Sequence, residues 1–252
     1  MLRYRLASLL MVSLLLAATL LAGCQRAAPP TAPPTVAPGT GALTPAGSPQ
    51  RGGALMVAIA ADPDGLDPHK TVAAATFQIT RNIYDTLVQA DDKGRIVPDL
   101  ALSWEPSADG LTWTFTLREG VKFHNGRTMT ADDVKYSFER LLAPETASPR
   151  AKDFAVVQSV AAPDAKTVVF TLKAPSAPFL SNLAYGWAAI VPQEAAATLR
   201  DQPVGTGPFK VVQWVKDSHV ALERFDDYFV PGVPYLDTAT FRVITDPSSR
   251  MA

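Results

Sequence analysis

The sequence predicts an α+β fold for residues 51–252, on the basis of three features. Residues 111–117 alternate strictly between apolar and polar side chains, which predicts a half-buried strand. Thr130 and Asp133 form a capping-box-like pair ahead of apolar residues at helical spacing, which predicts a helix. Many of the expected strands are joined by hairpin turns without a regular strand-helix-strand repeat, which favours α+β over a doubly wound sheet.

The first predicted elements are a strand and a helix. Residues 55–60 are a short apolar run that ends at the turn sequence 62–65, and they therefore predict a buried strand. Residues 72–88 predict a helix, because their apolar side chains fit one helical face. These side chains are Phe77, Ile83, Tyr84 and Leu87.

Two hairpin signals follow. Asp109-Gly110 precedes the alternating strand, so we expect a hairpin whose first arm contains Leu102 and Trp104. Asn125-Gly126 gives the second hairpin signal. We expect the aromatic residues of the alternating strands to lie in the core, namely Trp104, Trp113 and Phe115.

The remaining elements are predicted from the same patterns. The helix after Thr130 is expected to bury a stripe of Val134, Phe138 and Leu141. A short helix is expected at 193–200. Strands are expected at 154–160, 167–173, 209–214, 220–224 and 241–244.

The N-terminus has the parts of a bacterial export signal. Arg3 and Arg5 provide a positive start, and residues 7–20 are an almost unbroken apolar run. This run is shorter than the roughly 20 residues that span a bilayer, and small residues follow it. Residues 1–23 are therefore predicted to be a cleavable signal peptide.

Cys24 is the only cysteine in the chain, which excludes an internal disulfide. The sequence Leu21-Ala22-Gly23-Cys24 resembles a bacterial lipobox, whose cysteine receives a diacylglyceryl group and becomes the new N-terminus. The resemblance implies a lipid anchor at Cys24, held stably by two or more acyl chains such as palmitate. An ordinary membrane anchor with an incidental cysteine is the alternative.

Residues 25–50 are rich in Pro, Ala, Thr and Gly, with Arg26 as their one charge. They contain no aromatic residue and no periodic apolar pattern, so they cannot bury enough surface to offset chain entropy. Residues 24–50 are thus predicted to be the lipidated cysteine and a disordered, extended tether to the folded domain.

The charge balance gives no indication of a nucleic-acid partner. The chain has 23 Lys and Arg against 24 Asp and Glu, and its first 50 residues contain basic but no acidic side chains. The folded part is therefore mildly acidic. It also lacks a basic run interleaved with aromatic residues.

No catalytic constellation is recognisable in the sequence. His69, His124 and His219 are widely separated without metal-ligand spacing, and no nucleophile elbow or phosphate loop is present. Gly205-Thr206-Gly207 resembles the start of a dinucleotide fingerprint, but Pro208 follows where a helix would begin, so we predict a turn. His124 is expected to be a structural hydrogen-bonding residue. These features predict a binding protein with no catalytic residue, no metal site and no cofactor.

A set of short motifs occurs in order along the folded part. They lie at 62–68 (DPDGLDP), 82–88 (NIYDTLV), 96–101 (IVPDLA), 103–105 (SWE), 109–118 (DGLTWTFTLR), 120–126 (GVKFHNG), 130–140 (TADDVKYSFER), 205–209 (GTGPF) and 227–228 (DY). Together they resemble the extracellular solute-binding protein family 5, the peptide, dipeptide and nickel receptors of ABC importers. The resemblance covers about Gly53 to Arg250. Asn125 stands where the family more often has aspartate, and both residues suit a type I′ turn before Gly126.

The resemblance implies the first lobe of a bilobed periplasmic-binding-protein-like fold, of the type II, large peptide-binding class. Such proteins close on ligand by a hinge motion. A larger subdomain is expected to comprise 51–87 and 204–252, with an inserted subdomain at 88–203. The family's complete chains are about twice as long, so the second lobe is expected to be absent from this chain.

The function implied is that of a substrate-binding lipoprotein of an ABC importer. It would capture peptides, a nickel complex or another small solute outside the membrane and deliver them to the permease complex. The implied location is the cell envelope, anchored by lipid on the outer face of the cytoplasmic membrane, or periplasmic in a diderm host. A solute sensor for a signalling partner and a surface hydrolase are the alternatives.

Two groups of residues are candidates for contact with a solute. By resemblance, Asp64, Gly65 and Leu66 are expected at the edge of the cleft. Tyr185, Gly186 and Trp187 place an aromatic pair beside a glycine, and such a pair can wall a pocket and stack on a ligand. Ordinary packing is the alternative for each group.

Overall fold

The computed structural model describes residues 49–251. The predicted signal peptide, Cys24 and the tether as far as residue 48 lie outside the described residues. Among the helices that are described, none has the length and apolar composition needed to cross a membrane.

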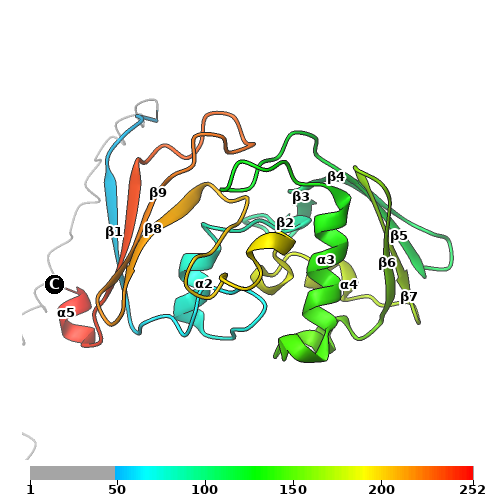
Figure 1. The fold of residues 1–252 in the computed structure, drawn as a ribbon, viewed down its shortest axis with the longest axis horizontal. Coiled ribbons are helices and arrows are strands. Elements are labelled where there is room, and N and C mark those ends of the chain that lie inside the picture. Colours follow the sequence, from blue (N-terminus) through cyan, green and yellow to red (C-terminus); the bar gives the residue numbers. More distant parts are fainter. Residues whose placement is uncertain (1–48, 252) are drawn as a thin grey trace, which may run out of the picture. The chain divides into compact units, whose positions relative to one another are not determined.

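The first sheet brings the beginning and the end of the described chain together. Its strands are β1 (Ala54–Ile59), β8 (Phe209–Val215), β9 (His219–Arg224) and β10 (Thr238–Val243), in the order β1-β10-β9-β8 (Figure 1). β1 is parallel to β10, and the other neighbours are antiparallel. The strands expected at 209–214 and 220–224 are confirmed as β8 and β9, which pair as an antiparallel hairpin, and Asp217 in its turn has a φ of 58°.

The second sheet is antiparallel throughout. It contains β4 (Ala101–Pro106), β5 (Thr112–Leu117), β6 (Val157–Asp164) and β7 (Thr167–Leu172), in the order β4-β5-β7-β6. The predicted β4–β5 hairpin is confirmed. Phe115 is fully buried, while Trp104 and Trp113 are partly buried against the same core.

The predicted strand at 154–160 begins only at Val157, because Phe154 ends a short 3-10 helix instead. The Phe154 ring packs edge-on against Phe138, with 5.4 Å between their centroids. This contact turns Phe154 toward the core helix. A further small ribbon, β2 (Val88–Ala90) with β3 (Ile96–Pro98), was not among the predicted elements.

Helix α3 (Ala131–Leu142) begins as the sequence predicts. The Thr130 side chain and the Asp133 side chain form a reciprocal capping box, and Val134, Phe138 and Leu141 are buried. The other α-helices are α2 (Ala74–Thr80), α4 (Phe179–Asn182) and α5 (Pro247–Met251). Short 3-10 helices lie at Pro144–Thr146 (η1), Ala151–Phe154 (η2), Gly186–Ala188 (η3) and Gln193–Ala195 (η4). The helix expected at 193–200 is thus limited to one 3-10 turn, followed by further turns.

Helix α2 is much shorter than the predicted span of 72–88. The backbone oxygens of Asn82 and Ile83 accept hydrogen bonds from Phe209 N (2.9 Å) and Gly207 N (2.9 Å). These carbonyls therefore pair with the loop at 205–209 instead of continuing the helix. The loop backbone approaches so closely that a Cβ added at Gly205 would lie 2.0 Å from the Ile83 oxygen. The predicted turn at 205–207 is confirmed, and its glycines are needed for this contact.

Two hydrophobic clusters fill the described part. One lies between the second sheet and α3, and it includes Phe115, Phe138 and Phe170. The other packs beneath the first sheet with α2 and includes Leu66, Leu199 and Phe241. Figure 1 shows the two four-stranded sheets on opposite sides of the described part of the protein, with α2 and α3 between them. The subdomain boundaries expected from the sequence stay a prediction.

Candidate functional site

The loop after β1 is fixed to the start of α2 by the Asp64 carboxylate. Asp64 Oδ1 accepts hydrogen bonds from Thr71 Oγ1 (2.8 Å) and Thr76 Oγ1 (2.7 Å). The Asp64 amide in turn donates to Thr76 Oγ1 at 3.2 Å. Helix α2 has no side-chain cap at Ala73, and these bonds join the loop to the Thr76 side chain in its first turn. Asp64 therefore positions the loop as well as facing solvent.

Gly65 and Leu66 lie beside Arg200. The Leu66 amide donates to the Arg200 backbone oxygen at 2.8 Å, and a Cβ added at Gly65 would lie 3.1 Å from Arg200 Cγ. The Leu66 side chain is fully buried in the second cluster, and its carbonyl accepts from Tyr84 Oη at 3.1 Å. Leu66 therefore presents no side chain to a solute.

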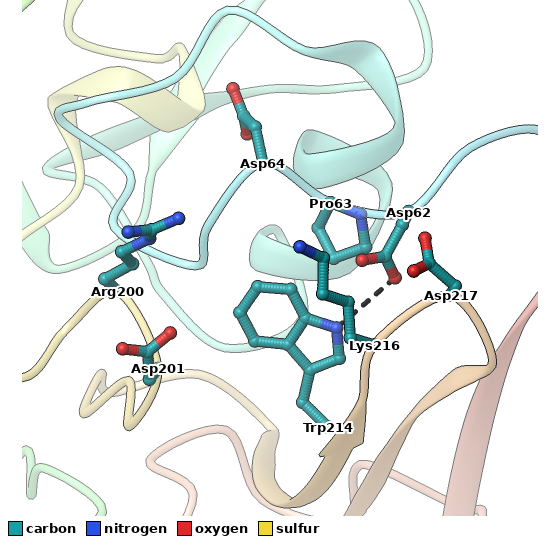
Figure 2. Close-up of a pocket in the computed structure, with 8 residues that line it drawn as sticks. All are labelled: Asp62, Pro63, Asp64, Arg200, Asp201, Trp214, Lys216 and Asp217. Carbon is teal, nitrogen blue, oxygen red and sulfur yellow. Dashed lines mark hydrogen bonds between the residues drawn. The ribbon is translucent and has the colours of Figure 1, made fainter.

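An open pocket of about 490 Å³ lies where this loop meets the β8–β9 turn. Its lining residues are Asp62, Pro63, Asp64, Arg200, Asp201, Trp214, Lys216 and Asp217. Figure 2 shows the Trp214 indole in the middle, with Arg200 and Asp201 to one side and Asp62 and Asp217 to the other. Trp214 Nε1 donates to Asp62 Oδ1 at 3.3 Å. The pocket thus offers an aromatic surface with charges of both signs at its rim.

A second hollow, of about 420 Å³, adjoins the first. It shares Asp64 and Arg200 with that pocket, and Gly65, Lys70 and Thr71 also line it. Asp64 and Gly65, predicted from the sequence, are therefore pocket-lining residues. Arg200, Trp214 and Lys216 were missed, because they come from distant segments and no motif of their own marks them.

The aromatic pair predicted at 185–187 forms a second surface. The rings of Tyr185 and Trp187 are stacked, with 4.4 Å between centroids and an interplanar angle of 16°. Half of the Tyr185 surface is exposed, at 50%. Phe77 meets Trp187 edge-on at 5.8 Å, and the Arg150 guanidinium carbon lies 4.3 Å from the Trp187 ring centroid. Trp187 is therefore held on several sides, while Tyr185 faces solvent.

Helix α2 connects the two surfaces. Thr76 bonds to the Asp64 carboxylate, and the next residue, Phe77, contacts Trp187. Gly186 leaves room for Phe77 here, because a Cβ at this position would lie 3.2 Å from Phe77 Cδ1 and would require a small shift of the ring. The structure thus brings both predicted groups against one turn of a helix, although the groups are far apart in sequence.

A buried ion pair between Arg140 and Asp67 also holds the loop that follows β1. Arg140 Nη2 donates to Asp67 Oδ2 at 2.5 Å, and Arg140 Nη1 donates to Asp67 Oδ1 (3.1 Å) and to His69 Nδ1 (2.8 Å). Since arginine only donates, His69 Nδ1 must accept, and His69 Nε2 carries the proton given to the Ala189 oxygen (3.0 Å). Burial, and then the charge of Arg140, lower the pKa of His69 to about 4. His69 is therefore neutral and structural.

His124 is also structural, as the sequence predicts. Its Nε2 lies 2.9 Å from the Gly207 oxygen, and its ring packs edge-on against Phe225. Burial lowers the pKa of His124 to about 4. Within the described residues, no group of three or more His, Cys, Asp or Glu side chains is arranged to hold a metal ion.

Comparison with solved structures defines the class of protein. DppA from Helicobacter pylori, in complex with the peptide STSA, matches with a TM-score of 0.74 and 37% identity, over 80% of this chain and 44% of that one. AppA from Bacillus subtilis, in complex with a nonapeptide, matches with a TM-score of 0.75 and 30% identity, over 80% and 42%. The described residues thus form one lobe of a bilobed periplasmic binding protein.

The sequence comparisons give the family. The model of bacterial extracellular solute-binding proteins, family 5 Middle, matches residues 95–252, and the chain belongs to this family. Similar proteins include di/tripeptide-binding protein 2 of Pseudomonas aeruginosa (34% identical, 78% of this chain, 42% of the relative). Another is glutathione-binding protein GsiB of Pectobacterium atrosepticum (34% identical, 78% of this chain, 39% of the relative). The chain therefore spans well under half the length of these relatives, which are binding proteins rather than enzymes.

Proposed function

We propose that this chain is the first lobe of a substrate-binding lipoprotein that serves an ABC importer. It captures peptides, or another small solute, outside the membrane and delivers them to the permease. One observation carries the proposal: about four fifths of the chain match proteins that bind dipeptides, tripeptides, oligopeptides or glutathione. A solute-binding role agrees with a pocket that combines an indole with charged side chains, and no catalysis is required.

We assign the solute-facing surface to the two groups predicted from the sequence. Asp64 and Gly65 line the pockets, Leu66 anchors their loop, and Tyr185, Gly186 and Trp187 form the aromatic wall. The larger subdomain, 51–87 with 204–252, carries the first group. The insert, 88–203, carries the second. A second lobe closing over this surface would desolvate the solute and strengthen its polar contacts.

The solute role is tested with the full-length product of the source gene, which is first sequenced beyond the codon for Ala252. Binding of a panel of di- to pentapeptides is measured by isothermal titration calorimetry. Saturable binding without peptide hydrolysis is expected. Failure of a folded, full-length protein to bind any peptide would overturn the peptide-receptor proposal.

The aromatic wall is tested by Tyr185→Ala. Loss of the exposed ring is expected to weaken peptide binding by about 3- to 10-fold, since an aromatic contact contributes roughly 0.5–1.5 kcal/mol beyond its buried area. Tyr235→Ala is the matched control, because Tyr235 is similarly exposed at 41% but lies in the loop before β10. Equal affinities for the two variants would remove Tyr185 from the site.

The membrane attachment is tested at Cys24. Cells grown with labelled palmitate are expected to incorporate it into the wild-type protein and not into a Cys24→Ser variant. The variant is also expected to leave the membrane fraction. A labelled Cys24→Ser protein would contradict the lipid anchor at this position.

A further inference from the structure

Arg150 is held against the aromatic wall with its hydrogen-bonding capacity almost unused. It lies between η1 and η2, and its guanidinium covers the Trp187 ring at 4.3 Å. Its side chain is 35% exposed, so it can be reached from solvent. No hydrogen bond links this guanidinium to another described residue, and its Nε is buried without an acceptor.

Arg140 and Arg127 show a fully engaged guanidinium in this chain. Arg140 binds the Asp67 carboxylate through two nitrogens, and Arg127 binds Asp133 in the same way. The carboxylate beside Arg150 is Asp153, whose Oδ2 lies 3.6 Å from Nη1. This distance is too long for a hydrogen bond, so the ion pair leaves the guanidinium fork open.

A second unused donor lies in the same place. Trp187 Nε1 is buried and has no acceptor among the described residues. Both unpaired donors are shielded from solvent, so a solute would meet the terminal guanidinium nitrogens of Arg150 rather than these two atoms. The stacking of Tyr185 and the edge contact of Phe77 hold the indole, and the Arg150 guanidinium carbon lies 4.3 Å from the indole ring centroid. The indole therefore positions the guanidinium beside the exposed Tyr185 ring.

We infer that Arg150, with Trp187 and Tyr185, forms a subsite for a carboxylate group of the bound solute. A guanidinium presents a planar fork of donors that matches a carboxylate in two parallel hydrogen bonds. The stacked aromatic rings keep that fork partly dehydrated and provide an apolar floor for the carbon atoms next to the carboxylate. The inference rests on the proposed function and adds the chemical class of solute that this surface prefers.

Asp153 sets the strength of this preference. Its carboxylate lies near the guanidinium without bonding to it, and an incoming carboxylate would displace it from the vicinity of Nη1. Repulsion between the two carboxylates weakens binding of the solute. Asp153→Asn is therefore expected to strengthen the binding of an acidic solute and to leave a neutral one unchanged.

The test uses four peptides and the full-length gene product. The peptides are Ala-Glu-Ala and Ala-Gln-Ala, each with a free C-terminus and with a C-terminal amide. Binding is measured by calorimetry for the wild type, Arg150→Met, Arg150→Lys and the control Arg242→Met, which removes an exposed charge from β10. Thermal unfolding of each variant confirms that it is folded.

Arg150→Met is expected to weaken binding of the carboxylate-bearing peptides by about 10-fold or more, because charge-assisted hydrogen bonds are lost. Arg150→Lys should retain part of the affinity, and Arg242→Met all of it. A loss confined to the Glu peptides assigns the subsite to an acidic side chain. A loss confined to the free-acid peptides assigns it to the C-terminus.

Two results separate this inference from the proposed function. If peptides bind and Arg150→Met weakens all four equally or none, the carboxylate subsite is wrong while the receptor role stands. If no peptide binds to the wild type, the receptor role fails, and succinate and succinamide are then titrated. An Arg150-dependent preference for succinate would retain the carboxylate subsite, and its absence would overturn it.

Discussion

Asp67 and Asp85 are both buried carboxylates of this lobe, at 4% and 8% exposure, but their partners differ. Asp67 receives two hydrogen bonds from the Arg140 guanidinium. Asp85 accepts from two hydroxyl groups instead, Thr206 Oγ1 at 2.8 Å and Tyr228 Oη at 3.3 Å. One carboxylate is thus neutralised by a cation, and the other is solvated only by neutral donors.

A second acid, Asp99, raises the pKa of Asp85 further. Burial raises the pKa of Asp99 to about 6, and burial together with the charge of Asp99 raises the pKa of Asp85 to about 8. Arg118 Nε donates to the Asp99 backbone oxygen at 2.5 Å, and the charge of Arg118 only partly offsets the rise in the pKa of Asp99. Asp67 thus has a cation in direct contact, whereas Asp85 has only neutral donors and a second acid nearby, and the pKa of Asp85 is raised accordingly.

The largest expected effect follows from removing the cation. Arg140→Met leaves Asp67 buried without a counter-charge and removes the donor to His69, so a loss of about 3–5 kcal/mol in the free energy of unfolding is expected. Urea denaturation at pH 7 measures it. Arg224→Met is the control, since that arginine pairs with two exposed aspartates and should cost about 1 kcal/mol or less.

A double-mutant cycle tests the assignment to Asp67. Arg140→Met leaves the Asp67 carboxylate buried without its cation, and Asp67→Asn removes that carboxylate. The double variant should therefore lose clearly less free energy of unfolding than the sum of the two single losses. Strict additivity would show that the two side chains do not stabilise each other.

The acid pair predicts a fall in stability with rising pH. The unfolded chain releases the Asp85 proton near pH 4, whereas the folded chain holds it until about pH 8, so stability declines over this range. His69 and His124 act oppositely below about pH 6.5, because they are neutral in the fold and protonated in the unfolded chain. The two effects should nearly cancel between pH 4 and 6, which leaves a decline from pH 6.5 to 8 of at most about 1.4 kcal/mol per pH unit.

Asp85→Asn sharpens this prediction. The amide cannot ionise but can still accept from Thr206, so the decline between pH 6.5 and 8 should disappear while stability at pH 6 changes little. Denaturation midpoints at pH 6, 7 and 8 measure the slope. If the variant keeps the wild-type slope, another group is responsible for the decline.

The smallest expected effects come from the two hydroxyl donors. Thr206→Val removes the shorter bond at a fully buried residue and is expected to cost about 1–3 kcal/mol. Tyr228→Phe removes the longer bond at a residue that is only partly buried, with an expected cost of about 0.5–1.5 kcal/mol. Unfolding at pH 6 compares them, and a larger loss for Tyr228→Phe would reverse the ranking drawn from their distances.

Local signals predicted much of the fold. The alternation at 111–117, the pair Thr130 and Asp133, and the turn at Asp109-Gly110 each specify a structure through neighbours in sequence, and all three predictions are confirmed. The ribbon β2–β3 was missed because its strands are three residues each, too short for an alternating pattern to stand out.

The candidate site was predictable only in part. Asp64 and Gly65 belong to a motif and could be found, and Tyr185 and Trp187 could be noted as an aromatic pair. Arg200, Trp214 and Arg150 could not, because each is an ordinary residue in its own segment and gains its role from a partner far along the chain.

Most strands, the capped helix, the turns and the family could be predicted from the sequence, because they depend on spacing and on local hydrogen bonds. The end of α2 could not, since the carbonyls of Asn82 and Ile83 pair with a loop more than 120 residues away. The raised pKa of Asp85 could not either, because its main cause is burial in the folded lobe. Burial and long-range contacts set such properties, and neither is written in the pattern of neighbouring residues.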